Sequence, residues 1–260
     1  MNDLSSNIFS VELLRYTDRA LDLLLETKGT RLSSDVDVTK MTEEERQAHL
    51  DYMKDTIKSS WEFVDYTFKI TQVTRAFTHQ LVRTRTGTYA QQAMRVADVR
   101  EQPVDTPPNV TNDPRAAQMW HRLVNEVIEG YGELLDHGIA PQDARGILPT
   151  NMTTSIIAKF NLRTLHDMGL VRLCTRTQGE YQSVFRAMRA EVLRVHPWAE
   201  GFIEANCVQL GVCAFPRYGK TECPVYLPEM DNSAVRRAAK ERWEGSAHEA
   251  SPIAKGGMAQ

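Results

Sequence analysis

Apolar side chains recur at two different spacings along the chain, and each spacing predicts one kind of element. Between Trp120 and Leu135 the apolar positions lie three, one, three, one, three, three and one residues apart. That spacing places them on one face of an α-helix. Asp113 is a capping residue, Pro114 suits the first helical position, and Gly138 stops the pattern. The sequence therefore predicts a long amphipathic helix that begins at Pro114 and ends before Gly138.

A second spacing appears in residues 61–70, WEFVDYTFKI, where apolar and polar residues alternate. Val64, Tyr66, Phe68 and Ile70 share one face, and most of them are aromatic or β-branched. A period of two with these residue types is typical of a half-buried β-strand. We therefore predict a strand over 61–70.

Other segments show the helical spacing over shorter lengths. Thr42 and Glu45 form a capping-box pattern in front of one of them. Proline and asparagine in 97–112, and the segment 208–228, predict loops. One strand among many helices predicts an α+β fold that is mostly helical, with residues 1–230 as a single domain and 231–260 as a polar, partly disordered tail. The further helices are expected at 10–28, 42–59, 72–83, 153–171, 178–195 and 198–207.

Composition excludes several classes of protein. The chain has 260 residues, 42% of them hydrophobic and 25% charged, which is ordinary for a globular protein. Its net charge of −3 does not favour nonspecific nucleic-acid binding. It lacks an apolar run of about 18 residues, so we expect no membrane span and a cytoplasmic protein. Glycine-rich phosphate loops, GxSxG and HExxH are absent, which removes support for Rossmann enzymes, P-loop NTPases, serine hydrolases and zincins.

The chain has four cysteines, and three of them fall within 17 residues. The three clustered cysteines contain no CxxC pair, so they do not form an ordinary zinc knuckle. An all-cysteine zinc site with Cys174 as the fourth ligand is still compatible with the sequence, because metal ligands can be far apart along a chain. The alternative is four reduced, mostly buried thiols, and we assign no metal ligands. The cysteines are Cys174, Cys207, Cys213 and Cys223.

Residues 75–96 are the densest source of groups that bind an anion. Arg75, His79 and Arg83 recur at four-residue steps, so they form one cationic stripe on a helix. A polar run that includes Gln91 and Gln92 follows Gly87, and its amides suit a heterocycle beside a phosphate. The alternative interpretation is a solvated amphipathic helix followed by a surface loop.

The order of several motifs resembles the flavin-dependent thymidylate synthases. The motifs are EEERxxHLxYM, WEFVDYTF, HQLVRTRTGTYAQQAMR, ARGILPTN and NLRTLHDMGLVRLCTRTQGEY. The resemblance extends from about Glu43 to Glu191. The family signature is RHR, seven residues, Ser, one residue and Arg. Arg83-Thr84-Arg85, seven residues, Ala93, Met94 and Arg95 stand at those positions.

This resemblance implies a fold with a small antiparallel sheet and a homotetramer with sites shared between subunits. It implies FAD as cofactor, dUMP as substrate, and methylenetetrahydrofolate and NADPH as co-substrates for methylation at C5. The substrate residues would be Gln80, Gln91, Gln92, Ala93, Arg95, Arg145 and Arg172, with Arg172 as the catalytic residue. The cofactor residues would be Arg83, Thr84, Arg85, Asn161, Arg163 and Asp167.

The role implied for Arg172 is chemically reasonable. Chemistry at C5 of uracil pushes negative charge onto the carbonyl oxygens, and a fixed guanidinium stabilises that charge most strongly in a dry site. Arginine also suits the 5′-phosphate, because its planar fork matches two oxygens.

Three positions depart from the family pattern. Thr84 replaces the signature histidine, Ala93 replaces the serine, and Gln91 stands where the family has a carboxylate. A divergent paralogue that alkylates another pyrimidine nucleotide, or only binds nucleotide as a regulator, therefore stays open.

Some candidate residues have a purely structural alternative. Arg145 lies in a predicted surface turn and suits a salt bridge. Arg163 and Asp167 are four residues apart and can pair on a helix. Asn161 suits a buried, satisfied amide.

Overall fold

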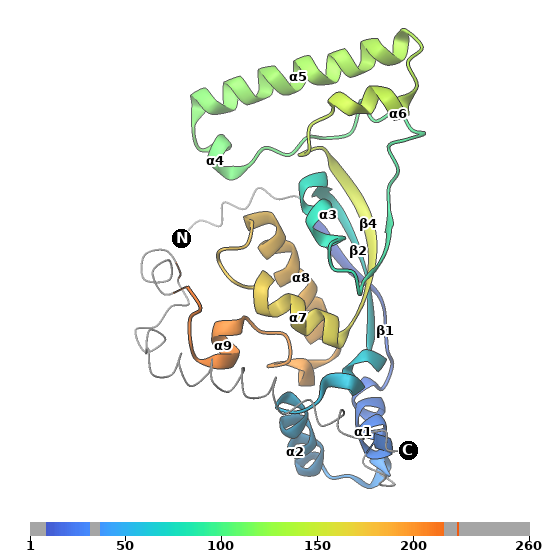
Figure 1. Ribbon diagram of the computed structural model, residues 1–260, viewed down its shortest axis with the longest axis vertical. Helices are drawn as coiled ribbons and strands as arrows, with labels where there is room; N and C mark the ends of the chain where they lie inside the picture. Colours follow the sequence, from blue (N-terminus) through green and yellow to red (C-terminus); the bar gives the residue numbers. More distant parts are fainter. Residues whose placement is uncertain (1–8, 32–36, 216–222, 224–260) are drawn as a thin grey trace, which may run out of the picture.

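The computed structural model describes residues 9–31, 37–215 and 223, and it shows the α+β fold that the sequence predicts. Four strands form one antiparallel sheet in the order β1-β2-β4-β3. Helices α3, α7 and α8 lie on one face of this sheet (Figure 1). The strands are β1 (Ser10–Tyr16), β2 (Asp65–Thr74), β3 (Thr88–Gln91) and β4 (Thr153–Asn161).

The helices alternate with these strands along the chain. The α-helices are α1 (Ala20–Arg31), α2 (Glu43–Lys54), α3 (Arg75–Leu81), α4 (Pro108–Thr111), α5 (Pro114–Asp136), α6 (Pro141–Ala144), α7 (Leu162–Arg172), α8 (Gly179–Val195) and α9 (Asn206–Leu210). Short 3-10 helices are η1 (Val38–Lys40), η2 (Lys58–Phe63), η3 (Arg145–Ile147) and η4 (Pro197–Ala199).

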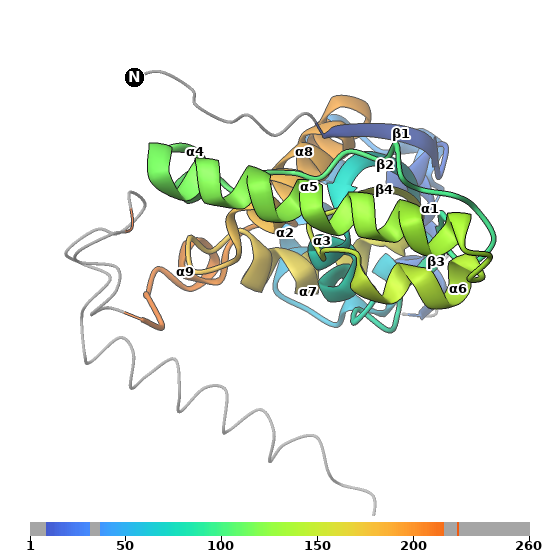
Figure 2. The ribbon, with the colours of Figure 1, turned by 90° about the horizontal axis from the view of Figure 1, so that it is seen from above.

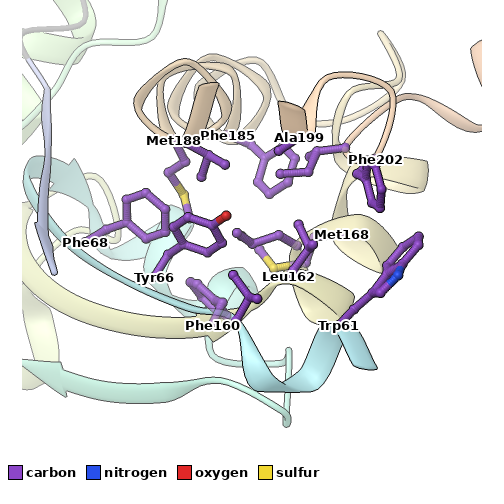
Figure 3. Packing of buried hydrophobic residues seen from close by; sticks show 14 of the residues in the cluster. Trp61, Tyr66, Phe68, Phe160, Leu162, Met168, Phe185, Met188, Ala199 and Phe202 are labelled. Carbon is purple, nitrogen blue, oxygen red and sulfur yellow. The ribbon is translucent and has the colours of Figure 1, made fainter. Parts of the chain in front are cut away.

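The alternating segment forms β2, a central strand of the sheet. Its apolar face is confirmed, because Tyr66, Phe68 and Ile70 are fully buried. They pack with side chains of α7 and α8 in the main core (Figure 3). Near its end the strand bulges, and Gln72 adopts a left-handed φ of 56°. The bulge bends the strand just before it enters α3.

Two of the helix predictions were wrong, because each segment contains a strand followed by a helix. Residues 10–28 divide into β1 and α1, and residues 153–171 divide into β4 and α7. In the second segment Ile157 is 41% exposed, while its neighbour Ile156 is buried, as the two faces of a strand require. Pairing with β2 makes this run of β-branched residues a strand, since tertiary contacts override local helical spacing.

Other predictions need smaller corrections. Residues 198–207 form η4 and the start of α9 with a non-helical stretch between them, in place of one helix. The predicted loop 97–112 contains the short helix α4, and the predicted loop 208–228 begins within α9. The predicted strand 61–70 begins within η2. The capping box of Thr42 and Glu45 is present as predicted at the start of α2.

The long helix α5 matches its prediction and lies apart from the main core. Together with α4 and α6 it stands beyond one end of the sheet, while α1 and α2 lie at the other end (Figure 1). Seen from above, α5 crosses over the sheet (Figure 2). Only Tyr131 and Gly132 of its residues are buried, in and beside a small second apolar cluster.

The polar tail that we predicted over 231–260 lies outside the described residues. Within the part of the chain that is described, no helix has the length and apolar content that crossing a membrane requires.

Candidate active site

The first turn of α3 is anchored to α8. Thr74 caps α3 by accepting a hydrogen bond from the backbone N–H of Phe77 at 3.0 Å. The carboxylate of Glu180 in turn accepts from the backbone N–H of Thr74 at 2.7 Å and from its hydroxyl at 2.5 Å. Burial raises the pKa of Glu180, and Asp105 nearby adds to the rise. This network fixes the helix that carries Arg75, His79 and Gln80.

Gln80 and Arg172 face the same cavity, although they are far apart in sequence. The cavity has a volume of about 610 Å³ and lies between the end of α3, the end of α7 and the chain around α9. At its edge the side-chain amide of Gln80 donates to the side-chain carbonyl of Gln178 at 2.6 Å. An amide and a guanidinium on one cavity can bind the polar edge of a heterocycle.

Arg172 lies over an aromatic ring that is itself held in place. Its guanidinium carbon is 4.3 Å from the ring centroid of Tyr181, which is fully buried. Phe77 contacts the same ring edge-on, with centroids 5.0 Å apart. A cation over a buried aromatic face is attracted to it, so the ring sets the direction of the guanidinium.

Thr84 lies beside the same tyrosine. The Tyr181 hydroxyl is buried without a hydrogen-bond partner of ordinary geometry within the described residues. Burial raises its pKa, while the side chains of Arg172 and Thr84 both act to lower it. Thr84, at the signature histidine position, is thereby linked through Tyr181 to Arg172.

The signature turn at residues 83–87 is held by Tyr89. The Tyr89 hydroxyl shares its one proton between the carbonyl oxygens of Thr84 at 2.6 Å and Leu81 at 3.0 Å. Burial raises the pKa of Tyr89 to about 12. Gly87 is required here, because a Cβ at this position would overlap the Tyr89 hydroxyl and the Phe160 ring.

The guanidinium groups of this turn face solvent. Arg83 and Arg85 are exposed and form no ion pair within residues 9–31 and 37–215. The turn also contacts the start of α7, where the Thr164 hydroxyl donates to the Thr86 hydroxyl at 3.0 Å. Two free cations beside a helix N-terminus form an environment that attracts anions.

The strand β3 and the residues after it contribute a second polar group. Gln91 donates its side-chain amide to the Thr78 hydroxyl at 2.9 Å. Arg75 donates to the backbone carbonyl of Gln92 at 2.8 Å, and its Nε is buried without a partner in the described chain. Burial lowers the pKa of Arg75, and the nearby positive charge of Arg145 lowers it further. Two adjacent guanidiniums favour an anion between them.

The remaining substrate candidates are exposed. Arg145 donates to the backbone carbonyl of Gln142 at 3.2 Å, and no salt bridge of its own is found within the described ranges. Ala93 and Arg95 are exposed and follow β3 directly. Whatever Ala93 contacts, its side chain cannot supply the hydrogen bond of the family's serine.

Two of the predicted cofactor residues, Asn161 and Arg163, lie at the start of α7. Asn161 caps this helix, because its side chain accepts from the backbone N–H of Thr164 at 2.8 Å. Arg163 pairs with Glu62 at 2.5 Å, so the alternative pairing with Asp167 is wrong. Asp167 is exposed.

One chain therefore does not bring every candidate residue together. Arg163 and Arg172 are nine residues apart on one straight helix, which separates their backbones by about 14 Å. The structure sets Gln80 and Arg172 on one cavity, places Thr84 and Arg172 beside Tyr181, and leaves Arg163 at the opposite end of α7.

Sequence reasoning did not single out three residues that organise this region. Gln178, Glu180 and Tyr181 lie in or next to the turn between α7 and α8. Their run, QGEY, follows Arg172 closely, and that proximity to a candidate catalytic residue was the available signal.

This cationic, amide-lined region has the chemistry that suits an anionic ligand, and comparison with known proteins identifies the family of the chain. A family model described as "Thymidylate synthase complementing protein" matches residues 12–198. A flavin-dependent thymidylate synthase from Sulfurisphaera tokodaii is 31% identical over 209 residues, covering 76% of this chain and 79% of the relative. One from Pyrococcus abyssi is 32% identical over 219 residues, covering 78% and 88%. The chain belongs to the flavin-dependent thymidylate synthase family and is an enzyme.

A solved structure supports the fold. The crystal structure of a UMP/dUMP methylase, PolB, from Streptomyces cacaoi bound with 5-Br dUMP superposes with a TM-score of 0.65. It is 18% identical to this chain, and the match covers 75% of this chain and 94% of that structure. The shared fold confirms the mostly helical architecture with its small antiparallel sheet.

Proposed function

We propose that this enzyme methylates dUMP at C5 to give dTMP, with methylenetetrahydrofolate as carbon donor and NADPH as reductant. The observation that carries the proposal is the position of Arg172, half-buried on the cavity that Gln80 also lines and fixed over the Tyr181 ring. Membership in the flavin-dependent thymidylate synthase family supplies the reaction class.

Arg172 acts on the uracil ring in this proposal. Its guanidinium stabilises negative charge that develops on the carbonyl oxygens when C5 reacts. The side-chain amide of Gln80 binds the donor and acceptor edge of the base. Because Tyr181 already orients Arg172, little reorganisation is needed when that charge forms.

In this proposal the 5′-phosphate is held by a separate group of arginines. Arg75 and Arg145 lie close enough for the charge of one to lower the pKa of the other, and a phosphate between them removes this repulsion. Arg95, exposed after β3, adds a further cation.

The residues near the signature turn fit FAD. Arg83 and Arg85 are unpaired within the described chain and lie next to the first turn of α7, a donor set suited to a diphosphate. Asn161 and Arg163, at the start of α7, complete the set of residues proposed to bind FAD. FAD, when bound, supplies the hydride chemistry, and the protein positions and orients the reactants.

We further propose that the active protein is a homotetramer with sites shared between subunits. The wide separation of Arg163 and Arg172 along α7 supports this proposal. A second subunit can bring its own FAD-binding residues next to the dUMP-binding residues of the first. The apolar face of α5 supports it too, since Met119 and Leu123 are 56% and 46% exposed.

The test is product analysis with the purified protein. Incubation with dUMP, methylenetetrahydrofolate, FAD and NADPH is expected to release tritium from C5-labelled dUMP and to give a product of the mass of dTMP. A protein that binds no FAD, or releases no tritium with all co-reactants present, would contradict the proposal.

A second candidate is alkylation of another pyrimidine nucleotide, or nucleotide binding alone. It is favoured by the replacement of a family carboxylate with Gln91, whose amide is occupied by Thr78. The same assay with UMP and dCMP separates the possibilities. A faster reaction with either one, or binding without turnover, selects the second candidate.

A further inference from the structure

All four cysteines of the chain line the cavity that Arg172 faces. They come from three separate parts of the chain. Cys174 follows α7, Cys207 lies in α9, Cys213 follows α9, and Cys223 lies ten residues further along. The four are free thiols, each half-buried. Gathering every thiol of a 260-residue chain on one cavity requires an explanation beyond packing.

Several contacts hold these thiol-bearing segments together. The guanidinium of Arg176 lies over the ring of Phe215 at 3.9 Å, which joins the turn of Cys174 to the segment of Cys213. The Cys213 sulfur also accepts a hydrogen bond from the backbone N–H of Phe215 at 3.3 Å. This hydrogen bond holds the Cys213 side chain within the segment that lines the cavity.

Four half-buried thiols on one cavity present four soft ligands to the same space. A soft divalent cation displaces the thiol protons and binds the thiolates directly.

We propose that Cys174, Cys207, Cys213 and Cys223 bind one structural zinc ion. Four thiolates match the closed tetrahedral shell of structural zinc sites, and thiolate ligands favour zinc over harder cations. Among the described residues, no three His, Cys, Asp or Glu side chains already stand in a ligand shell. Binding one ion therefore requires the four thiols to move toward a common point.

Such an ion would fix one wall of the active-site cavity. Cys174 is two residues beyond Arg172, and Cys207 and Cys213 bring the α9 region against the same turn. Zinc would thus tie the residues after α7 to a segment distant in sequence.

The experiment measures metal content of the full-length protein, expressed in zinc-supplemented medium without an affinity tag and purified without chelators. We expect about one zinc per chain by inductively coupled plasma mass spectrometry. The substitutions Cys174→Ser and Cys213→Ser are each expected to lower zinc at least fivefold. Asn206→Ser, which changes a polar residue on the same cavity, is the matched control and retains zinc.

A second measurement avoids dependence on variants that fail to fold. Titrating the unmodified protein with a mercurial thiol reagent is expected to release its zinc, and four thiols react per ion released. Replacing zinc with cobalt(II) is expected to give the visible absorption of a tetrahedral thiolate site. Zinc-free protein, iron in place of zinc, disulfides among these cysteines, or equal zinc in the serine variants would each overturn the proposal. None of these results depends on turnover, so they are separate from the test of the proposed reaction.

Discussion

Helices α8 and α5 both carry a regular apolar face, but they are covered very differently. Five side chains of the 17-residue α8 are buried, and the ring of Tyr181 supports Arg172. The 23-residue α5 buries only Tyr131 and Gly132, although its apolar spacing is the clearest in the chain. The single chain therefore leaves most of the apolar face of α5 uncovered. This open face is one reason for our proposal that another subunit covers it.

The largest loss of stability is expected when a buried side chain of α8 is removed. Phe185→Ala removes a fully buried ring and leaves a cavity, so the free energy of unfolding should fall by about 3–5 kcal/mol. Urea unfolding at several protein concentrations measures this loss, which should not depend on concentration. Val171→Ala, at a position 58% exposed on α7, is the control and should change stability by about 0.5 kcal/mol at most.

Substitutions on the exposed face of α5 are expected to change the assembly of the protein and to leave the fold intact. The double substitution Met119→Arg and Leu123→Arg places charges on the exposed apolar face without disturbing the main core. The chain should stay folded by circular dichroism but dissociate, as measured by light scattering after size exclusion. Charges on the polar face of the same helix, as in Gln118→Arg, should leave the assembly intact. A double variant that keeps the size of the unmodified protein would show that α5 is not an interface.

A smaller effect is expected where α8 meets the site. Tyr181→Leu removes the ring beneath Arg172, and losing a cation–π contact of about 0.5–2 kcal/mol should lower kcat/KM roughly 2- to 30-fold. Tyr181→Phe keeps the ring and should stay close to the unmodified enzyme. Equal losses in both variants would mean that the hydroxyl, and not the ring, positions Arg172.

The smallest effect concerns Glu180, also on α8. Its folded-state pKa is raised above the ordinary 4.5 by burial, so folding disfavours its ionised form. The stability it contributes is fully present below pH 4.5 and is lost as pH rises through the folded-state pKa. Glu180→Gln does not titrate, so the unmodified protein should gain stability relative to this variant as pH falls from 8 toward 4.5. Chemical unfolding of both proteins across that range gives the difference, and a difference that grows with pH would contradict this assignment.

The sequence was most informative where local pattern and tertiary context agree. The caps at Asp113 and Thr42 and the alternation through Tyr66 predicted elements that the structure contains. The run from Thr153 to Asn161 was misassigned because its spacing is compatible with a helix, and only pairing with β2 makes it a strand. Local sequence does not contain that partner.

The candidate site shows the same limit. The motifs placed Gln80 and Arg172 in one region, and the structure sets both on one cavity. Tyr181 supports Arg172 because α8 packs beside the end of α7. The spacing of residues in the sequence does not reveal how two helices pack. The pairing of Arg163 with Glu62 likewise depends on contact between α7 and η2, elements far apart in sequence.

The claim that the site is shared between subunits is tested most directly by mixing two inactive variants. Arg172→Ala and Arg163→Ala change opposite ends of α7, and each alone should have almost no activity. If each site combines one residue from each of two subunits, random hybrids should regain about a quarter of the native sites. Co-expression with two different tags, purification of the hybrids and the tritium-release assay give the result. Hybrids that stay inactive, or an Arg163→Ala protein that keeps full activity, would contradict a shared site.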